Sequence, residues 1–179
     1  MSTLMVYESM WGNTRAVAEA VADRLGEDVT VVEVSDAPAR LPAGLDLLVV
    51  GGPTHAFSMT RAKTRRSAVE QGADPAHVER GIREWLDEVE VTDLVDVATF
   101  DTRIGGPMQH LPGSAAKAAG RHVRHHHVGR LVASESCYVD EGQGPLSAGE
   151  LGRAQAWGES LAHRDRVGPG GGGGPDGAV

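Results

Sequence analysis

The sequence has little cysteine, few aromatic residues and no long apolar run. Its single cysteine, Cys137, excludes an internal disulfide and favours a reducing, cytoplasmic compartment. No apolar stretch approaches the roughly 20 residues of a membrane-spanning helix, and no basic stretch followed by an apolar one marks a signal peptide. Aromatic residues make up only 4% of the chain, so the abundant small aliphatic residues favour helices packed tightly over a sheet.

An excess of positive charge is also missing. The formal net charge is -8 and the isoelectric point is about 5.4, so the overall cationic character typical of nucleic-acid-binding proteins is absent. An acidic surface is compatible with solubility and with docking to basic protein partners. The length of 179 residues predicts one domain with its own hydrophobic core.

Apolar runs and helical periodicity alternate along the chain, which predicts a parallel sheet covered by helices on both faces. The connection at 36–44 contains two prolines and a glycine, so we expect the second crossover to be reduced to a loop. The glycine- and proline-rich end predicts a disordered tail at 166–179 after a domain at 1–165. We expect strands at 4–7, 29–34, 45–50, 95–100 and 128–133, and helices at 13–25, 61–71, 75–89, 114–125 and 147–162.

The strongest signal lies at 9–14, between the first expected strand and the first expected helix. A helix N-terminus offers unpaired N–H groups and a positive dipole end, and both suit a phosphate group. Ser9 and Thr14 add hydroxyl donors, and Gly12 lets the backbone approach a ligand closely. The alternative is a plain helix cap by Ser9 or Asn13 with a turn at Gly12. Neither the Gly-x-Gly-x-x-Gly fingerprint nor a Gly-Lys-Ser/Thr phosphate loop is present here.

These residues resemble the flavodoxin family, whose phosphate loop often reads Thr/Ser-x-Thr-Gly-x-Thr. Ser9, Gly12 and Thr14 match it, and Trp11 in place of the middle threonine resembles the flavodoxin-like NAD(P)H:quinone oxidoreductase branch. The stretch 51–57 is similar to the family loop that wraps the isoalloxazine ring, and 100–107 is a weaker match to its third loop. The resemblance implies a flavodoxin-like doubly wound five-stranded parallel sheet of order 2-1-3-4-5, with helices on both faces and one non-covalent FMN.

The resemblance also implies which residues contact the cofactor. His55 or Phe57 is expected to cover a flavin ring face, against the alternative of an ordinary turn residue and a packed aromatic. Arg103 is expected near the pyrimidine side, where its charge would favour reduced, anionic flavin, against the alternative of a surface arginine paired with Asp101. The expected cofactor-binding residues are Ser9, Met10, Trp11, Gly12, Asn13, Thr14, Pro53, Thr54, His55, Ala56, Phe57, Asp101, Thr102, Arg103, Gly105 and Gly106.

Three other groups of residues invite functional readings. His122 and His126 share a helix face, but no cysteine or carboxylate nearby in the sequence completes a familiar metal motif, so we expect no metal site. Cys137 is expected to be a packed thiol near the end of the last strand. The basic cluster at 61–66 is expected to be a solvated helix face, with an anion site for NAD(P)H or an acidic partner as the alternative.

Three functions remain open from the sequence. The first is an FMN-dependent electron carrier that docks with a redox partner protein. The second is an FMN-dependent NAD(P)H:quinone oxidoreductase, for which NAD(P)H and a quinone are the partners and a homo-oligomer could complete the pocket. The third is a flavin-free interaction module of the same fold. In the first two the flavin carries the chemistry, so no catalytic side chain is expected.

Overall fold

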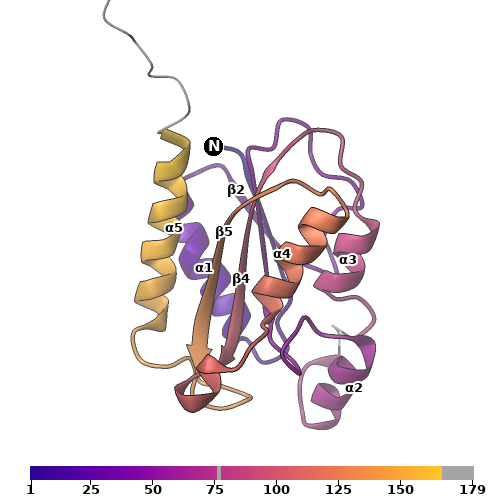
Figure 1. The fold of residues 1–179 in the computed structure, drawn as a ribbon, viewed down its shortest axis with the longest axis vertical. Coiled ribbons are helices and arrows are strands. Elements are labelled where there is room, and N and C mark those ends of the chain that lie inside the picture. The colour runs from indigo at the N-terminus through magenta and orange to yellow at the C-terminus, as the bar shows by residue number, and fades with distance from the viewer. Residues whose placement is uncertain (76–77, 167–179) are drawn as a thin grey trace, which may run out of the picture.

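The computed structural model describes residues 1–75 and 78–166, so the predicted tail lies outside the described residues except for Arg166. Five strands form one all-parallel sheet in the order β2-β1-β3-β4-β5 (Figure 1), which confirms the predicted fold class. The strands are β1 (Thr3–Tyr7), β2 (Val29–Glu33), β3 (Leu47–Pro53), β4 (Asp96–Ile104) and β5 (Arg130–Val139). The helices are α1 (Asn13–Leu25), α2 (Ala62–Glu70), α3 (Ile82–Glu88), α4 (Ala115–His125) and α5 (Glu150–Arg166), with a short 3₁₀ helix η2 (Gly106–His110).

Helices cover both faces of the sheet, as the nearly continuous apolar strands require. Helices α1 and α5 lie on one face, and α3 and α4 lie on the other (Figure 1). Alternate residues of β1 point to opposite faces, so Met5 belongs to the core under α1 and α5 while Leu4 and Val6 belong to the core under α3 and α4. Two apolar cores therefore fix the sheet from both sides.

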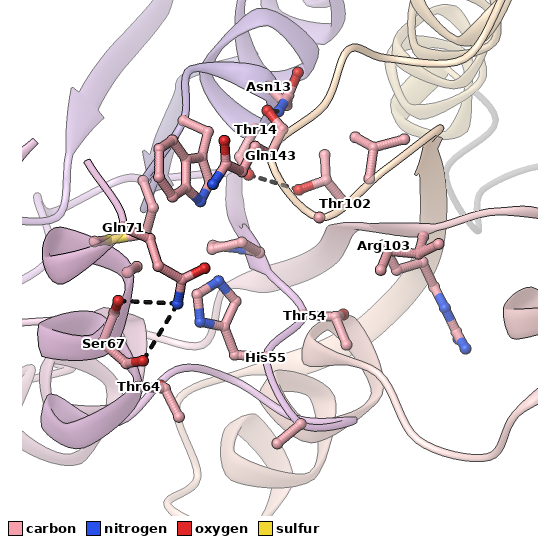
Figure 2. A pocket seen from close by; sticks show the side chains of 18 residues that line it. Asn13, Thr14, Thr54, His55, Thr64, Ser67, Gln71, Thr102, Arg103 and Gln143 are labelled. Atoms are coloured by element: carbon pink, nitrogen blue, oxygen red, sulfur yellow. Dashed lines mark hydrogen bonds between the residues drawn. The ribbon is translucent and has the colours of Figure 1, made fainter. Parts of the chain in front are cut away.

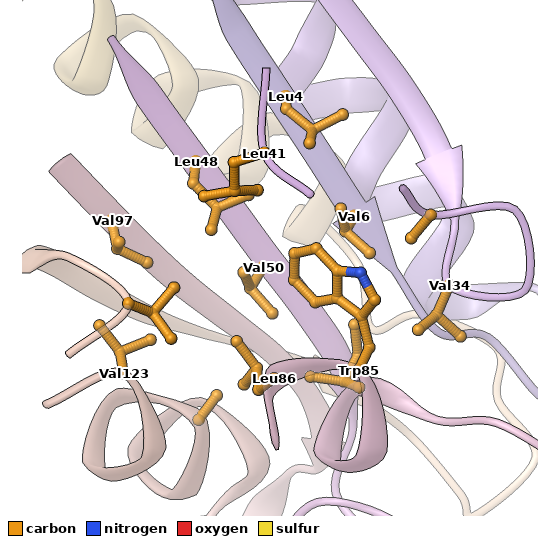
Figure 3. Packing of buried hydrophobic residues seen from close by; sticks show 14 of the residues in the cluster. Leu4, Val6, Val34, Leu41, Leu48, Val50, Trp85, Leu86, Val97 and Val123 are labelled. Carbon is orange, nitrogen blue, oxygen red and sulfur yellow. The ribbon is translucent and has the colours of Figure 1, made fainter. Parts of the chain in front are cut away.

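The connection from β2 to β3 contains no helix, as the sequence predicted. Helices α2 and α3 both lie in the next connection, between β3 and β4. Trp85 of α3 is fully buried among Val6, Val34 and Val50 (Figure 3), and its ring N–H donates to the Pro38 carbonyl oxygen at 2.9 Å. Helix α3 thus also covers sheet surface next to the helix-free connection.

The last two strands are longer than predicted. Strand β4 continues to Ile104 and β5 continues to Val139. After a register shift between Val97 and Ala98, the pairing is regular and joins Asp101 to Ser136 and Thr102 to Cys137. Cys137 is buried near the end of β5, as predicted, and burial raises its pKa to about 12. These strand ends contain polar residues, so a prediction from apolar runs ends the strands too early.

Two helices also differ from prediction. Of the helix predicted at 75–89, residues 76–77 lie outside the described residues, 78–81 are not helical, and α3 covers Ile82–Glu88. Helix α5 begins at Glu150 rather than at 147 and runs to Arg166. Within the described residues, no helix has both the length and the apolar character needed to cross a bilayer.

Candidate functional site

A cavity of about 360 Å³ lies where the carboxyl ends of β1, β3 and β4 meet. The chain leaves β1 towards β2 and then crosses back to β3, so this is the point at which parallel sheets of this type bind ligands. Ten of the predicted residues line the cavity: Met10, Trp11, Asn13, Thr14, Pro53, Thr54, His55, Ala56, Thr102 and Arg103. Ser9, Gly12, Phe57, Asp101, Gly105 and Gly106 are not part of this lining.

The loop before α1 presents main-chain groups at one end of the cavity. Gly12 precedes the helix in a left-handed conformation, with φ of 87°, and no heavy atom lies within 4 Å of the position that a β-carbon would occupy. Ser9 Oγ accepts hydrogen bonds from the N–H groups of Gly12 and Arg15 at 3.1 and 3.3 Å, so its side chain satisfies one donor in the first turn of α1. The N–H groups of Asn13 and Thr14 have no acceptor within the described part of the chain. They are available to an anion.

Two side chains tie this loop to the far side of the cavity (Figure 2). The Thr14 and Thr102 hydroxyl oxygens are 2.7 Å apart, and both residues are buried. Asn13 Nδ2 donates to the Gln143 carbonyl oxygen at 3.0 Å. The end of β4 and the connection between β5 and α5 therefore hold the helix N-terminus in place.

The second loop makes a strained two-residue turn. His55 and Ser58 exchange main-chain hydrogen bonds at 2.9 and 3.1 Å, while Ala56 and Phe57 between them have φ of 48° and 63°. Such a turn normally contains Asn or Gly, because a β-carbon in this conformation costs about 1–2 kcal/mol per residue. Strain of this kind concentrates at functional sites.

The turn separates the two aromatic candidates for ring contact. His55 lines the main cavity, and burial, assisted by the charge of Arg65, lowers its pKa, so the ring is neutral at pH 7. Phe57 is 49% exposed and lines a shallower hollow that shares Thr54 and Arg103 with the cavity. His55 therefore faces the cavity, and Phe57 lies at its border.

The third predicted segment contributes less than expected. Arg103 Nη2 donates to the Leu111 carbonyl oxygen at 3.0 Å, and Figure 2 shows the guanidinium directed away from Thr102 and Asn13. Asp101 is fully buried behind the cavity, where its Oδ2 accepts the Ala116 N–H at 2.8 Å. Burial raises the pKa of Asp101, and the hydrogen bond from the Ala116 N–H acts in the opposite direction.

One wall of the cavity was not predicted. The residues that line the cavity but were not expected from the sequence are Thr64, Ser67, Ala68 and Gln71 around α2, together with Ile104, Val139, Gly142 and Gln143. Gln71 Nε2 donates to the Ser67 carbonyl and hydroxyl oxygens at 3.0 and 3.3 Å (Figure 2). The polar side chains on this side therefore carry hydroxyl and amide groups.

A buried polar network fixes α2 beside the cavity. Arg65 is fully buried and donates to the Thr60 hydroxyl at 3.0 Å, to Glu84 Oε2 at 3.1 Å and to the Val78 carbonyl oxygen at 2.8 Å. The Thr60 hydroxyl in turn donates to Glu8 Oε1 at 2.6 Å. The prediction of a solvated basic face at 61–66 is therefore wrong for Arg65, because Glu84 and the main-chain carbonyls at 78–79 surround it. The sequence carries no signal for these partners.

Glu8 joins this network to the end of β1. Its Oε2 accepts the Ile82 N–H at 3.0 Å, and burial raises its pKa. A carboxylate removed from water is stable only with such partners. Glu8 therefore connects β1, α2 and α3 immediately behind the cavity, a positioning role that the sequence did not reveal.

Comparisons with known proteins agree with this architecture. The family model described as "Flavodoxin domain" matches residues 4–65, which include the first two predicted loops. No curated protein sequence matches the chain.

Solved structures share the fold over nearly the whole chain. Oxidised flavodoxin 2 from Bacillus cereus is 18% identical with a TM-score of 0.60, and covers 92% of this chain and 99% of its own. A flavodoxin from the domain Archaea is 16% identical with a TM-score of 0.57, at 93% and 99% coverage. General stress protein 14 from Treponema denticola, solved in complex with FMN, is 13% identical with a TM-score of 0.50, at 92% and 99% coverage. Residues 4–65 therefore match the flavodoxin domain model, and the described part of the chain has the flavodoxin fold.

Proposed function

We propose that the chain binds one FMN non-covalently in this cavity and transfers electrons through it to a redox partner. The observation that carries the proposal is the N-terminus of α1, which opens into the cavity with the Asn13 and Thr14 N–H groups free of acceptors among the described residues. Such a helix end attracts a phosphate group without requiring several cationic side chains. We expect a cytoplasmic location from the cysteine usage, and docking to a basic partner protein from the acidic composition.

The lining of the cavity fits FMN at both ends. Asn13 and Thr14 offer amide and hydroxyl groups where a phosphate would lie, while Trp11, Met10 and His55 offer aromatic and apolar side chains for contact with a ring. The volume falls within the roughly 300–1,000 Å³ range of ligand pockets. Bound FMN would supply the redox chemistry, and the residues of this chain would bind it, orient it and limit access of water.

Paired titrations with FMN and riboflavin test the phosphate end of the site. Asn13→Asp places a carboxylate at the first residue of α1, where it favours the helix dipole but repels a phosphate. Asn13→Ala, which also removes the bond to Gln143, is the matched control for that lost contact. We expect Asn13→Asp to weaken FMN binding at least about 10-fold relative to Asn13→Ala, a cost of about 1.4 kcal/mol or more. Riboflavin binding should be equal in both variants, as measured by quenching of flavin fluorescence.

Two results would contradict the proposal. The first is a folded wild-type protein, by circular dichroism, that leaves FMN fluorescence unchanged. The second is equal FMN affinity in Asn13→Asp and Asn13→Ala, which would show that the FMN phosphate does not bind at this helix N-terminus. If FMN binds, rapid loss of flavin absorbance on addition of NADH or NADPH, with turnover of a quinone, would identify a reductase rather than a carrier.

A further inference from the structure

A second group of chemically active side chains lies between α3 and α4, outside the lining of the cavity. Asp87 Oδ1 of α3 lies 3.0 Å from Nδ1 of His122 on α4 and 3.2 Å from Nε2 of His126, the C-cap residue of α4. The two imidazole rings are stacked, with centroids 5.3 Å apart and planes at 18°. All three ligand atoms lie within 4.8 Å of one another. The carboxylate is 35 residues away from His122 in the chain, which explains why the sequence showed two histidines without a third ligand.

The spacing and chemistry of these atoms suit a transition metal ion. Bonds of about 2.0–2.2 Å from zinc to nitrogen and oxygen, at tetrahedral angles, place neighbouring ligand atoms roughly 3.3 Å apart. The two measured separations are already near that value. We propose that Asp87, His122 and His126 form a binding site for a divalent transition metal ion of the Zn²⁺ class, with water completing the coordination.

The exposure of these side chains is compatible with a metal site. The side chains of Asp87 and His126 are 43% and 37% exposed, so an ion and its water ligands can reach them. His122 and His126 come from the end of α4 and Asp87 comes from α3, so the packing of these helices already holds the three residues close together.

Arg83 is the neighbour that opposes the metal ion. Its Nη1 lies 3.3 Å from His122 Nε2, and a metal ion on Nδ1 would leave the proton on Nε2, so two donors would face each other. Arg83 keeps its bonds to the Ser58 hydroxyl at 3.1 Å and to the Met59 carbonyl at 3.3 Å when that contact opens. Its positive charge reduces affinity, so removal of that charge should strengthen metal binding.

Calorimetric titration of Zn²⁺ into chelator-stripped, full-length protein tests the site. We expect one equivalent to bind the wild type, at least 10-fold weaker binding in Asp87→Asn and in His126→Ala, and several-fold tighter binding in Arg83→Gln. The matched control is His125→Ala, which removes an exposed histidine from the same helix outside the trio and should stay within twofold of wild type.

The proposal is wrong if the folded wild type takes up no zinc. It is equally wrong if Asp87→Asn binds like the wild type, or if His125→Ala loses as much affinity as His126→Ala, since the histidines of this helix end would then bind the ion without the defined trio. The titration is run with and without added FMN, so its outcome is independent of flavin binding.

Discussion

At position 51, in the middle of β3, any side chain larger than hydrogen has no space. A β-carbon built on Gly51 would fall within the ring of Phe100. Phe100 is itself 1% exposed and packs edge-on against Trp157, with ring centroids 6.1 Å apart, so it cannot move aside. The absence of a side chain on β3 is therefore what allows an aromatic residue on β4 to fill the core.

Gly51→Ala should lower the free energy of unfolding by about 2–3 kcal/mol, because overpacking forces a shift of the ring or of the strand. The matched control is Gly52→Ala at the adjacent position, where the nearest atom would be Ile82 Cγ1 at 3.7 Å, an ordinary contact. Gly52→Ala should stay within about 1 kcal/mol of wild type. Urea unfolding measures both, and equal losses in the two variants would show that Phe100 does not set the limit.

Asp101 is a buried carboxyl whose raised pKa has a consequence for stability. The native state holds this proton at pH values where the unfolded chain has released it, so the Asp101 contribution to stability falls as pH rises from 4 to 8. Asp101→Asn removes that dependence and keeps an oxygen able to accept the Ala116 N–H. The free energy of unfolding of the variant, relative to that of the wild type, should therefore be more favourable at pH 8 than at pH 4.

Urea unfolding at several pH values between 4 and 8 measures this difference. Asp93→Asn, at an exposed position, is the control and should follow the wild-type curve. A stability difference between Asp101→Asn and wild type that stays constant over this range, or that becomes less favourable to the variant as pH rises, would contradict the assigned direction.

At the scale of elements, the contact between α1 and α5 depends on close approach of two helix backbones. A β-carbon on Gly158 of α5 would lie 2.5 Å from the Val21 carbonyl oxygen of α1. That oxygen belongs to the helix backbone and cannot rotate away. The periodicity of α1 predicted its apolar face but not this partner, because the distance between the two helices depends on a residue 137 positions later in the chain.

Gly158→Ala should therefore lower the free energy of unfolding by about 1–3 kcal/mol through separation of α1 and α5. Gly152→Ala is a control on the same helix, where a β-carbon would have no neighbour within 4 Å. It should raise stability by about 0.5–1 kcal/mol, since alanine restricts the unfolded chain and favours helix. Thermal unfolding that ranks the two variants in the opposite order would contradict this account.

At the scale of the whole molecule, local patterns predicted the order of elements better than their ends. Helix α1 was placed at 13–25 because its apolar residues recur every four positions and Gly26 follows it. Strand β5 was placed too short because its second half, which includes Ser134, Glu135 and Ser136, is held by the ladder to β4 rather than by apolar character. Parallel pairing is a long-range property, and a reading of one segment at a time does not contain it.

The candidate site shows the same division. The loops that follow β1 and β3 were predicted because each has a local motif at a strand end, whereas the α2 wall and Gln143 reach the cavity only through the folded arrangement. Arg65 looked like a member of a basic surface cluster until Glu84 and Thr60 were placed around it. Side chains whose role depends on a distant partner gave no signal in the sequence.

The helix-free connection between β2 and β3 makes the next connection do two tasks. Its first half, α2, forms a wall of the cavity, and its second half, α3, inserts Trp85 over the sheet. Arg65 and Glu84 join the two halves. The connection between β3 and β4 thus encloses both the cavity and the core on that face of the sheet. A substitution in this connection can therefore disturb ligand binding, core packing or both.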